Sequence, residues 1–96
     1  MYCIFDTETT NFPDRKISPK HPAQGRIAQL GCIILDESFK EIESYDTLIK
    51  PDSTWNMSKG AQDVHGITRD MCESKGILMQ EAFDKFIQLR DKCILL

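Results

Sequence analysis

Apolar and polar residues along the chain follow a pattern that predicts three strands in its first half. Residues 2–5 form a continuous apolar run rich in β-forming side chains, which predicts a first strand that continues to about Glu8 and is covered on both faces. Residues 27–36 and 41–50 have the pattern of a second and a third strand, joined by the charged turn at 36–38. We expect this pair to form an antiparallel hairpin.

Two short helices are expected after the hairpin. The first spans about residues 57–64, with Ser53 or Asn56 as its N-cap and Gly66 at its end. The second is expected within residues 68–76, because a capping threonine opens that segment and a glycine closes it.

The clearest helix pattern lies near the end of the chain and leads into another apolar run at 93–96. A helix followed by an apolar strand is typical of the middle of an α/β domain. The helix has an apolar stripe at three- to four-residue spacing opposite polar residues. We expect the buried stripe to contain Met79, Ala82, Phe83, Phe86, Ile87 and Arg90.

Composition narrows the class of protein. The chain has 96 residues and a mass of 11.0 kDa, which excludes an enzyme of two domains. A hydrophobic content of 41% with 28% charged residues excludes a disordered or fibrous chain. No apolar run approaches the roughly 20 residues of a membrane span, and residues 1–5 lack the features of a secretory signal. We therefore expect a cytoplasmic protein with no membrane partner.

The four cysteines are Cys3, Cys32, Cys72 and Cys93, and none forms a Cys-x-x-Cys pair. We expect them to be reduced and mostly buried thiols. Disulfides or a metal site are the less favoured alternative, because disulfides are rare in cytosolic proteins.

The net charge of −3 argues against a protein that holds nucleic acid through a basic surface, although it leaves open binding through metal ions. Asp6 and Glu8 follow the first apolar run. Residues two apart in a strand point to the same face, so these carboxylates project together about 6.5–7 Å apart along the backbone. The spacing alone is also compatible with an ordinary exposed acidic pair. Next to a buried strand and with no basic neighbour, the pair is better explained by a divalent cation.

Four blocks of the sequence resemble, in order, the N-terminal half of the DnaQ-like DEDD 3′–5′ exonucleases, in particular the His-type branch. That family includes the proofreading subunit of bacterial replicative polymerase and the oligoribonuclease and RNase T groups. The blocks are Ile4-Phe5-Asp6-Thr7-Glu8-Thr9-Thr10, Arg26-Ile27-Ala28-Gln29-Leu30-Gly31, Leu48-Ile49-Lys50-Pro51 and Val64-His65-Gly66-Ile67-Thr68. One departure is Asn11, where the family commonly has a glycine; asparagine tolerates the left-handed conformation better than most residues.

The resemblance implies an α/β, RNase H-like mixed sheet with three antiparallel strands, the start of a parallel fourth strand and flanking helices. It implies two Mg²⁺ or Mn²⁺ ions, with Asp6 bridging both and Glu8 on the ion that activates the attacking water. Thr9 and Thr10 would contact the terminal nucleotide, and Val64 and His65 would line the pocket for the terminal nucleoside. For His65, a structural histidine bonded to nearby backbone is the alternative.

The resemblance further implies a parent enzyme that releases nucleoside 5′-monophosphates from the 3′ end of single-stranded DNA or RNA, with a polymerase as one conceivable partner. The later carboxylates and the general-base histidine of the family are absent from residues 1–96. We therefore expect this chain to be the N-terminal portion of a single exonuclease domain and to be inactive by itself.

Two alternative hypotheses keep the fold without catalysis. In the first, the chain is a nucleic-acid-binding or protein-interaction module. In the second, it is ordered only because another copy covers the sheet edge at 93–96. Two further features are left open: Trp55 is favoured as a packing anchor over a base-stacking residue, and the loop at 11–25 is either a solvated insertion or a contact to the scissile strand.

Overall fold

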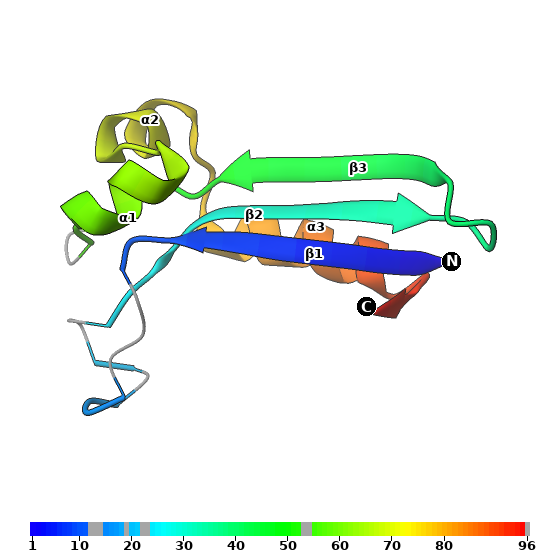
Figure 1. The fold of residues 1–96 in the computed structure, drawn as a ribbon, viewed down its shortest axis with the longest axis horizontal. Coiled ribbons are helices and arrows are strands. Elements are labelled where there is room, and N and C mark those ends of the chain that lie inside the picture. The colour runs from blue at the N-terminus through cyan, green and yellow to red at the C-terminus, as the bar shows by residue number, and fades with distance from the viewer. Residues whose placement is uncertain (12–14, 19, 22–23, 53–54, 96) are drawn as a thin grey trace.

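The computed structural model describes residues 1–11, 15–18, 20–21, 24–52 and 55–95, and Figure 1 shows their arrangement. A four-stranded sheet has the order β3-β2-β1-β4, in which β1 pairs antiparallel with β2 and parallel with β4. This is the mixed α/β sheet expected from the sequence. The elements in chain order are β1 (Tyr2–Thr9), β2 (Ile27–Leu35), β3 (Glu41–Leu48), α1 (Lys59–His65), α2 (Arg69–Lys75), α3 (Met79–Arg90) and β4 (Ile94–Leu95).

The expected hairpin of β2 and β3 is confirmed, with Gly31 opposite Asp46 in the antiparallel register. Its turn is held by the Asp36 carboxylate, which accepts hydrogen bonds from the backbone amides of Ser38 (2.8 Å) and Lys40 (3.0 Å). Phe39, in the turn, has a φ of +62°. No other non-glycine residue among those described has a positive φ, so Asn11 does not use the left-handed conformation that asparagine tolerates.

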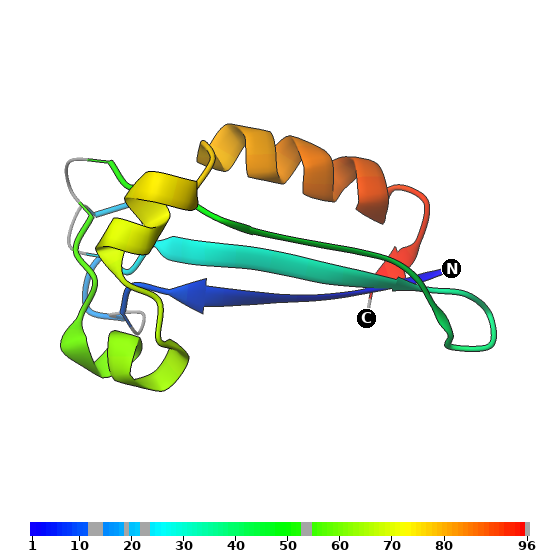
Figure 2. The same ribbon diagram turned by 90° about the horizontal axis from the view of Figure 1, so that it is seen from above.

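Helix α3 covers one face of the sheet, as Figure 2 shows from above. Its buried stripe is Ala82, Phe86 and Leu89, whereas Phe83 and Ile87 are 43% and 39% exposed. The expected stripe was therefore partly wrong. Residues 83 and 87 each lie about 100° around the helix from the buried residues before them, and the sheet covers only the narrower arc. The core beneath α3 contains Cys3, Leu30, Cys32, Ile34, Ile49, Ala82, Phe86 and Leu89.

The expectation that the first strand is covered on both faces was wrong for the described structure. β1 lies between β2 and β4, yet Ile4 remains 42% exposed, because α3 packs on the other face only. Within the part of the chain that the structure describes, the face of β1 that carries Ile4 has no helix over it (Figures 1 and 2). The open face therefore leaves the alternate side chains of β1 accessible.

The two short helices lie beyond the end of the sheet where β1 ends and β2 begins (Figure 1). Ser58, and not Asn56, is the N-cap of α1, and its hydroxyl accepts a hydrogen bond from an amide of the first turn (3.1 Å). The extended backbone lasts until Ser58 because its amide donates to the carbonyl of Thr10 (2.9 Å). The alternative cap, Ser53, lies outside the described residues. Gly66 ends α1 with a φ of +72°, as expected.

Trp55 is the centre of a second core cluster, with Ala28, Ile67 and Cys72, and is only 3% exposed. The guanidinium of Arg69 lies 5.7 Å from the centre of the indole ring and also donates to the Trp55 carbonyl. The packing interpretation of Trp55 is therefore confirmed. In the described residues no helix has the length and apolar character to span a bilayer.

The cysteines are free; Cys3, Cys32 and Cys72 are buried and Cys93 is partly buried. Burial raises the pKa of the Cys32 thiol from 9.0 to about 11, and the adjacent Cys3 thiol adds to the rise. Burial likewise raises the pKa of Cys3 and of Cys72. These thiols stay protonated and unreactive at neutral pH, as expected for structural cysteines.

The raised pKa of Cys32 predicts a loss of stability in alkali. From pH 9.0, where the unfolded thiol ionises, to about pH 11, where the folded thiol does, the folded state binds more protons, so stability falls as pH rises. For a shift of this size the loss is about 2–3 kcal/mol at most. Urea denaturation of the wild type and of Cys32→Ala across this range should give a flatter pH profile for the variant. Parallel profiles would contradict the assignment.

Candidate active site

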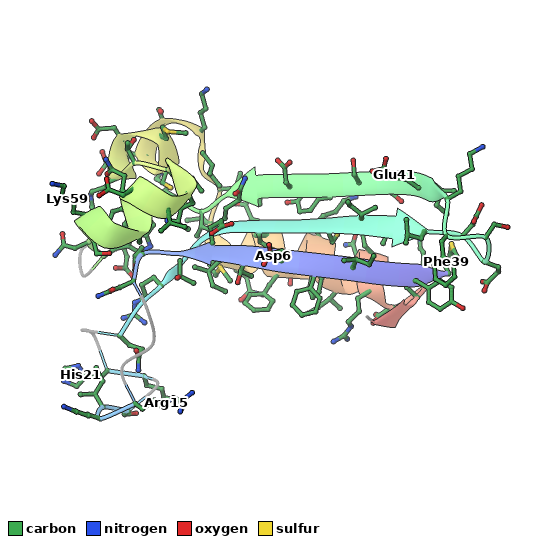
Figure 3. All side chains as sticks on the ribbon, viewed as in Figure 1. Asp6, Arg15, His21, Phe39, Glu41 and Lys59 are labelled. Atoms are coloured by element: carbon green, nitrogen blue, oxygen red, sulfur yellow. The ribbon has the colours of Figure 1, made fainter. Side chains whose placement is uncertain are left out.

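The alternation of β1 places Asp6 and Glu8 on the open face of the sheet. In the register with β2, Asp6 lies opposite Gly31 and Glu8 opposite Gln29. Cys3, on the other face, is fully buried beneath α3. Figure 3 shows Asp6 midway along β1, with α3 behind the sheet. The sequence expectation that the two carboxylates share one face therefore agrees with the geometry.

A groove of about 450 Å³ runs over this open face. Asp6, Glu8, Glu41 and Asp46 line it, and no Lys, Arg or His is among its lining residues. Gly31 lies between Asp6 and Asp46 in the cross-strand row, so no side chain separates these two carboxylates. Hard carboxylate oxygens without a cationic side chain beside them suit Mg²⁺ or Mn²⁺.

The described residues nevertheless provide only some of the ligands that a metal ion needs. One Asp6 oxygen, Oδ1, accepts a hydrogen bond from the Thr7 amide (2.8 Å), which orients the carboxylate. Within the described ranges, no three His, Cys, Asp or Glu side chains come close enough together to hold an ion. Asp6 and Glu8 can therefore supply two carboxylates, and the remaining ligands of an ion would be water, substrate or other groups.

A second, smaller hollow of about 70 Å³ adjoins the groove through Glu8. It brings together residues that lie more than fifty positions apart in the sequence, because α1 packs against the end of β1. Val64 is 79% exposed at the end of α1. The residues that line the hollow are Glu8, Thr9, Asn11, Ala61, Val64 and His65. Four of the six site residues expected from the sequence thus meet here.

Both ring nitrogens of His65 are bonded to the backbone. The Ile67 amide donates to Nδ1 (3.0 Å), so Nδ1 is an acceptor and the proton is assigned to Nε2. Nε2 then donates to the carbonyl of Thr9 (2.9 Å). The structural alternative for His65 is thus realised in this conformation, and a contact to a nucleoside would use the ring face or its carbon atoms.

This arrangement predicts that His65 stabilises the junction between α1 and β1. His65→Ala leaves the Thr9 carbonyl and the Ile67 amide without their partner, which should cost about 1–3 kcal/mol. Val64→Ala is the matched control, since that neighbouring side chain is 79% exposed and should change stability little. Chemical denaturation of both variants measures the difference, and equal stabilities would show that the two hydrogen bonds contribute nothing.

The two threonines after Glu8 differ in their surroundings. The Thr9 hydroxyl donates to the Asn11 carbonyl (2.9 Å) at the edge of the small hollow. Thr10 is only 2% exposed, and its hydroxyl accepts from the Arg26 amide (2.8 Å). Its amide donates to the Arg26 carbonyl (2.8 Å) and its carbonyl accepts from Ser58. Thr10 therefore ties β1 to the neighbouring segments and presents almost no surface to a ligand.

The sequence analysis missed two residues of the groove and left the position of the 11–25 loop open. Asp46 and Glu41 line the groove but were not among the residues expected from the sequence. The strand alternation across Gly31 could have indicated Asp46. In Figure 3, Arg15 and His21 lie on the loop that projects from the end of the sheet, well away from Asp6. The described part of the 11–25 loop therefore does not line the groove.

Comparisons with known proteins agree with this geometry. The chain is similar to E. coli exonuclease I in two complexes, with a 5cy-dA13 and with a dT13 oligonucleotide, at 27% sequence identity and TM-scores of 0.74 and 0.73. A product-bound structure of exonuclease I gives 27% identity and a TM-score of 0.74. These alignments cover 92% of this chain but only 18%, 18% and 19% of the three exonuclease I chains. A search of curated proteins gave no match.

The profile of the exonuclease family RNase_T matches residues 3–95, which is nearly the whole chain. The match spans both the strand that carries Asp6 and Glu8 and the helix end that carries His65. This chain belongs to the RNase_T family of exonucleases.

Proposed function

We propose that residues 1–96 supply the first two metal-binding carboxylates, and a wall of the nucleoside pocket, of a 3′–5′ exonuclease acting on single-stranded nucleic acid. The observation that carries this proposal is that Asp6 and Glu8 both line the groove on the open face, beside a hollow lined by Thr9, Val64 and His65. Family membership and the likeness to exonuclease I support the same reaction class.

In the proposed reaction, water attacks the phosphorus of the last phosphodiester and the P–O3′ bond breaks. The released nucleotide keeps the 5′-phosphate, and the shortened strand regains a 3′-hydroxyl after O3′ takes up a proton. Asp6 and Glu8 would hold divalent ions, Mg²⁺ or Mn²⁺. When bound, such ions stabilise the charge that develops on the scissile phosphate.

The residues of the small hollow would position the terminal nucleoside. Val64 offers an exposed apolar side chain that can pack against a base or sugar. Thr9 lines the same hollow, and the hydrogen bond from His65 to the Thr9 carbonyl ties α1 to the end of β1. Thr10 would act through the backbone of β1 and not by touching the nucleotide, since it is buried.

The test is a degradation assay on single-stranded DNA with Mg²⁺ or Mn²⁺. The protein from the reading frame that contains residues 1–96 should shorten a 5′-labelled oligonucleotide stepwise and release nucleoside 5′-monophosphates. Residues 1–96 alone should be inactive, because two carboxylates do not complete a two-ion site. Cleavage by residues 1–96 that depends on Asp6 would contradict the second statement. Binding of the strand without cleavage by the longer protein would favour the non-catalytic module.

The partners and the compartment are part of the same proposal. Single-stranded DNA is the first substrate to test, because the exonuclease I neighbours were determined with dA13 and dT13 oligonucleotides. A polymerase partner follows from the family resemblance, and co-purification from cells tests it. The cytoplasmic location was expected from the apolar pattern of the sequence, and cell fractionation tests it. Self-association through β4, a two-residue edge strand, is tested by sedimentation.

A further inference from the structure

A second large hollow, of about 390 Å³, lies at the end of the sheet on the side of α3. It is separate from the groove over Asp6 and Glu8, with which it shares no lining residue. Ile27, Ile49 and Met79 join its floor to the core beneath α3. Its lining residues are Gly25, Arg26, Ile27, Ile49, Lys50, Asp52, Trp55 and Met79.

Arg26 lines this hollow, and one nitrogen of its guanidinium group has no hydrogen-bond partner in the described part of the chain. That nitrogen is the buried Nε. The backbone of Arg26 is fixed, because Thr10 bonds to both its amide and its carbonyl (2.8 Å each). A buried N–H donor without an acceptor is unfavourable, so the position of this side chain is best explained by an acceptor that binds there.

Lys50 adds a second positive charge to the same hollow. Its backbone is held where β3 ends, since its amide donates to the Ile77 carbonyl (2.8 Å). Its side chain is in none of the ion pairs found among the described residues. With Asp52 also at the wall, two cationic groups and one carboxylate give the hollow a net positive charge, in a chain whose net charge is −3.

We propose that this hollow binds a phosphate group, from inorganic phosphate or from a phosphodiester of a nucleic acid strand. A guanidinium and an ammonium together match the several acceptor oxygens of a phosphate. Trp55 is 3% exposed and offers no free face for a base, so the phosphate and not the nucleoside is the group recognised. This proposal gives a role to Arg26 and Lys50, the charged residues of two of the sequence blocks, neither of which takes part in the carboxylate site.

Trp55 is the single tryptophan of the chain and lies in the wall of the hollow, so its fluorescence reports on occupancy. The experiment titrates residues 1–96 with sodium phosphate, and separately with a short deoxythymidine oligonucleotide lacking terminal phosphates. Both titrations are made in EDTA and at constant ionic strength with chloride. A saturable change with both ligands assigns the site to phosphate groups in general, and a change with one ligand only identifies that source.

Arg26→Met and Lys50→Met should each weaken the saturable binding by about tenfold or more, because each removes a charge-assisted contact. Lys59→Met is the matched control. Lys59 is exposed on α1 (Figure 3) and is not among the residues that line the hollow, so its loss should leave binding unchanged. Circular dichroism checks folding; if Arg26→Met does not fold, Lys50→Met decides, since Lys50 is exposed.

No saturable change with either ligand, or equal weakening by Lys59→Met, would overturn the phosphate site. The double variant Asp6→Asn, Glu8→Gln should bind phosphate as the wild type does. This variant distinguishes the phosphate site from the proposed exonuclease function. Phosphate binding can be absent while metal binding at Asp6 and Glu8 persists, and metal binding can be absent while phosphate binding persists.

Discussion

Replacing Asp6 with Asn should lower the exonuclease rate of the protein that contains residues 1–96 by about 10³-fold or more, because it removes a carboxylate expected to contact both metal ions. The side chain keeps its size and its place on the open face, opposite Gly31. The loss of rate would therefore measure the effect of removing the negative charge and the ligand oxygen, and not a change in the packing of β1. The rate is measured on a 5′-labelled single-stranded oligonucleotide with saturating Mn²⁺.

Asp46→Asn is the matched control for this prediction. Asp46 lines the same groove, lies across Gly31 from Asp6, and is likewise exposed. Removing its charge changes the electrostatic potential of the groove to a similar extent without removing a proposed ligand. If both variants lost activity equally, the effect of Asp6 would be one of general negative charge, and the assignment of Asp6 as a metal ligand would be wrong.

Gly76→Ala should destabilise the fold by about 3 kcal/mol or more, because the added methyl group meets backbone on all sides. A Cβ at this position would lie 2.4 Å from the Cys72 carbonyl oxygen, 2.6 Å from the Lys50 nitrogen and 2.7 Å from the Ile49 carbonyl carbon. None of these atoms is the movable end of a side chain. The close approach joins the end of α2 to the end of β3, so relief would require the two to separate.

Gly60→Ala, in the same chain, should have the opposite effect on stability. Gly60 is helical, in α1, and a Cβ there would have no heavy atom within 4 Å. Alanine should therefore stabilise the protein by about 0.5–1 kcal/mol through helix propensity. Denaturation midpoints of the two variants test the pair. A Gly76→Ala protein as stable as the wild type would mean that α2 and β3 do not approach as closely as described.

The strands and the shared face of Asp6 and Glu8 could be predicted from the sequence because they depend on local pattern. Continuous and alternating apolar runs predict strands, and a two-residue spacing within a strand places both carboxylates on one side. The glycines that end α1 and α2 were also predicted correctly, since Gly66 adopts a left-handed φ and Gly76 allows close packing.

What could not be predicted depends on contacts between distant segments. Ser58 caps α1 because its amide is held by Thr10, a bond across 48 positions that no local pattern contains. The buried arc of α3 is set by where the sheet lies, so the apolar spacing included Phe83 in error. The ring nitrogens of His65 likewise find their acceptor and donor only after α1 packs against β1.

The central claim is that Asp6 and Glu8 form a divalent cation site on the open face of the sheet, and Mn²⁺ titration of ¹⁵N-labelled residues 1–96 tests it most directly. Paramagnetic broadening should begin at the amides of Asp6, Thr7 and Glu8 and at Gly31 across the sheet. It should disappear in Asp6→Asn, Glu8→Gln; in the wild type the amides of α3, on the other face, should broaden only at higher Mn²⁺ concentrations. Broadening that is centred elsewhere, or that persists unchanged in the double variant, would contradict the account.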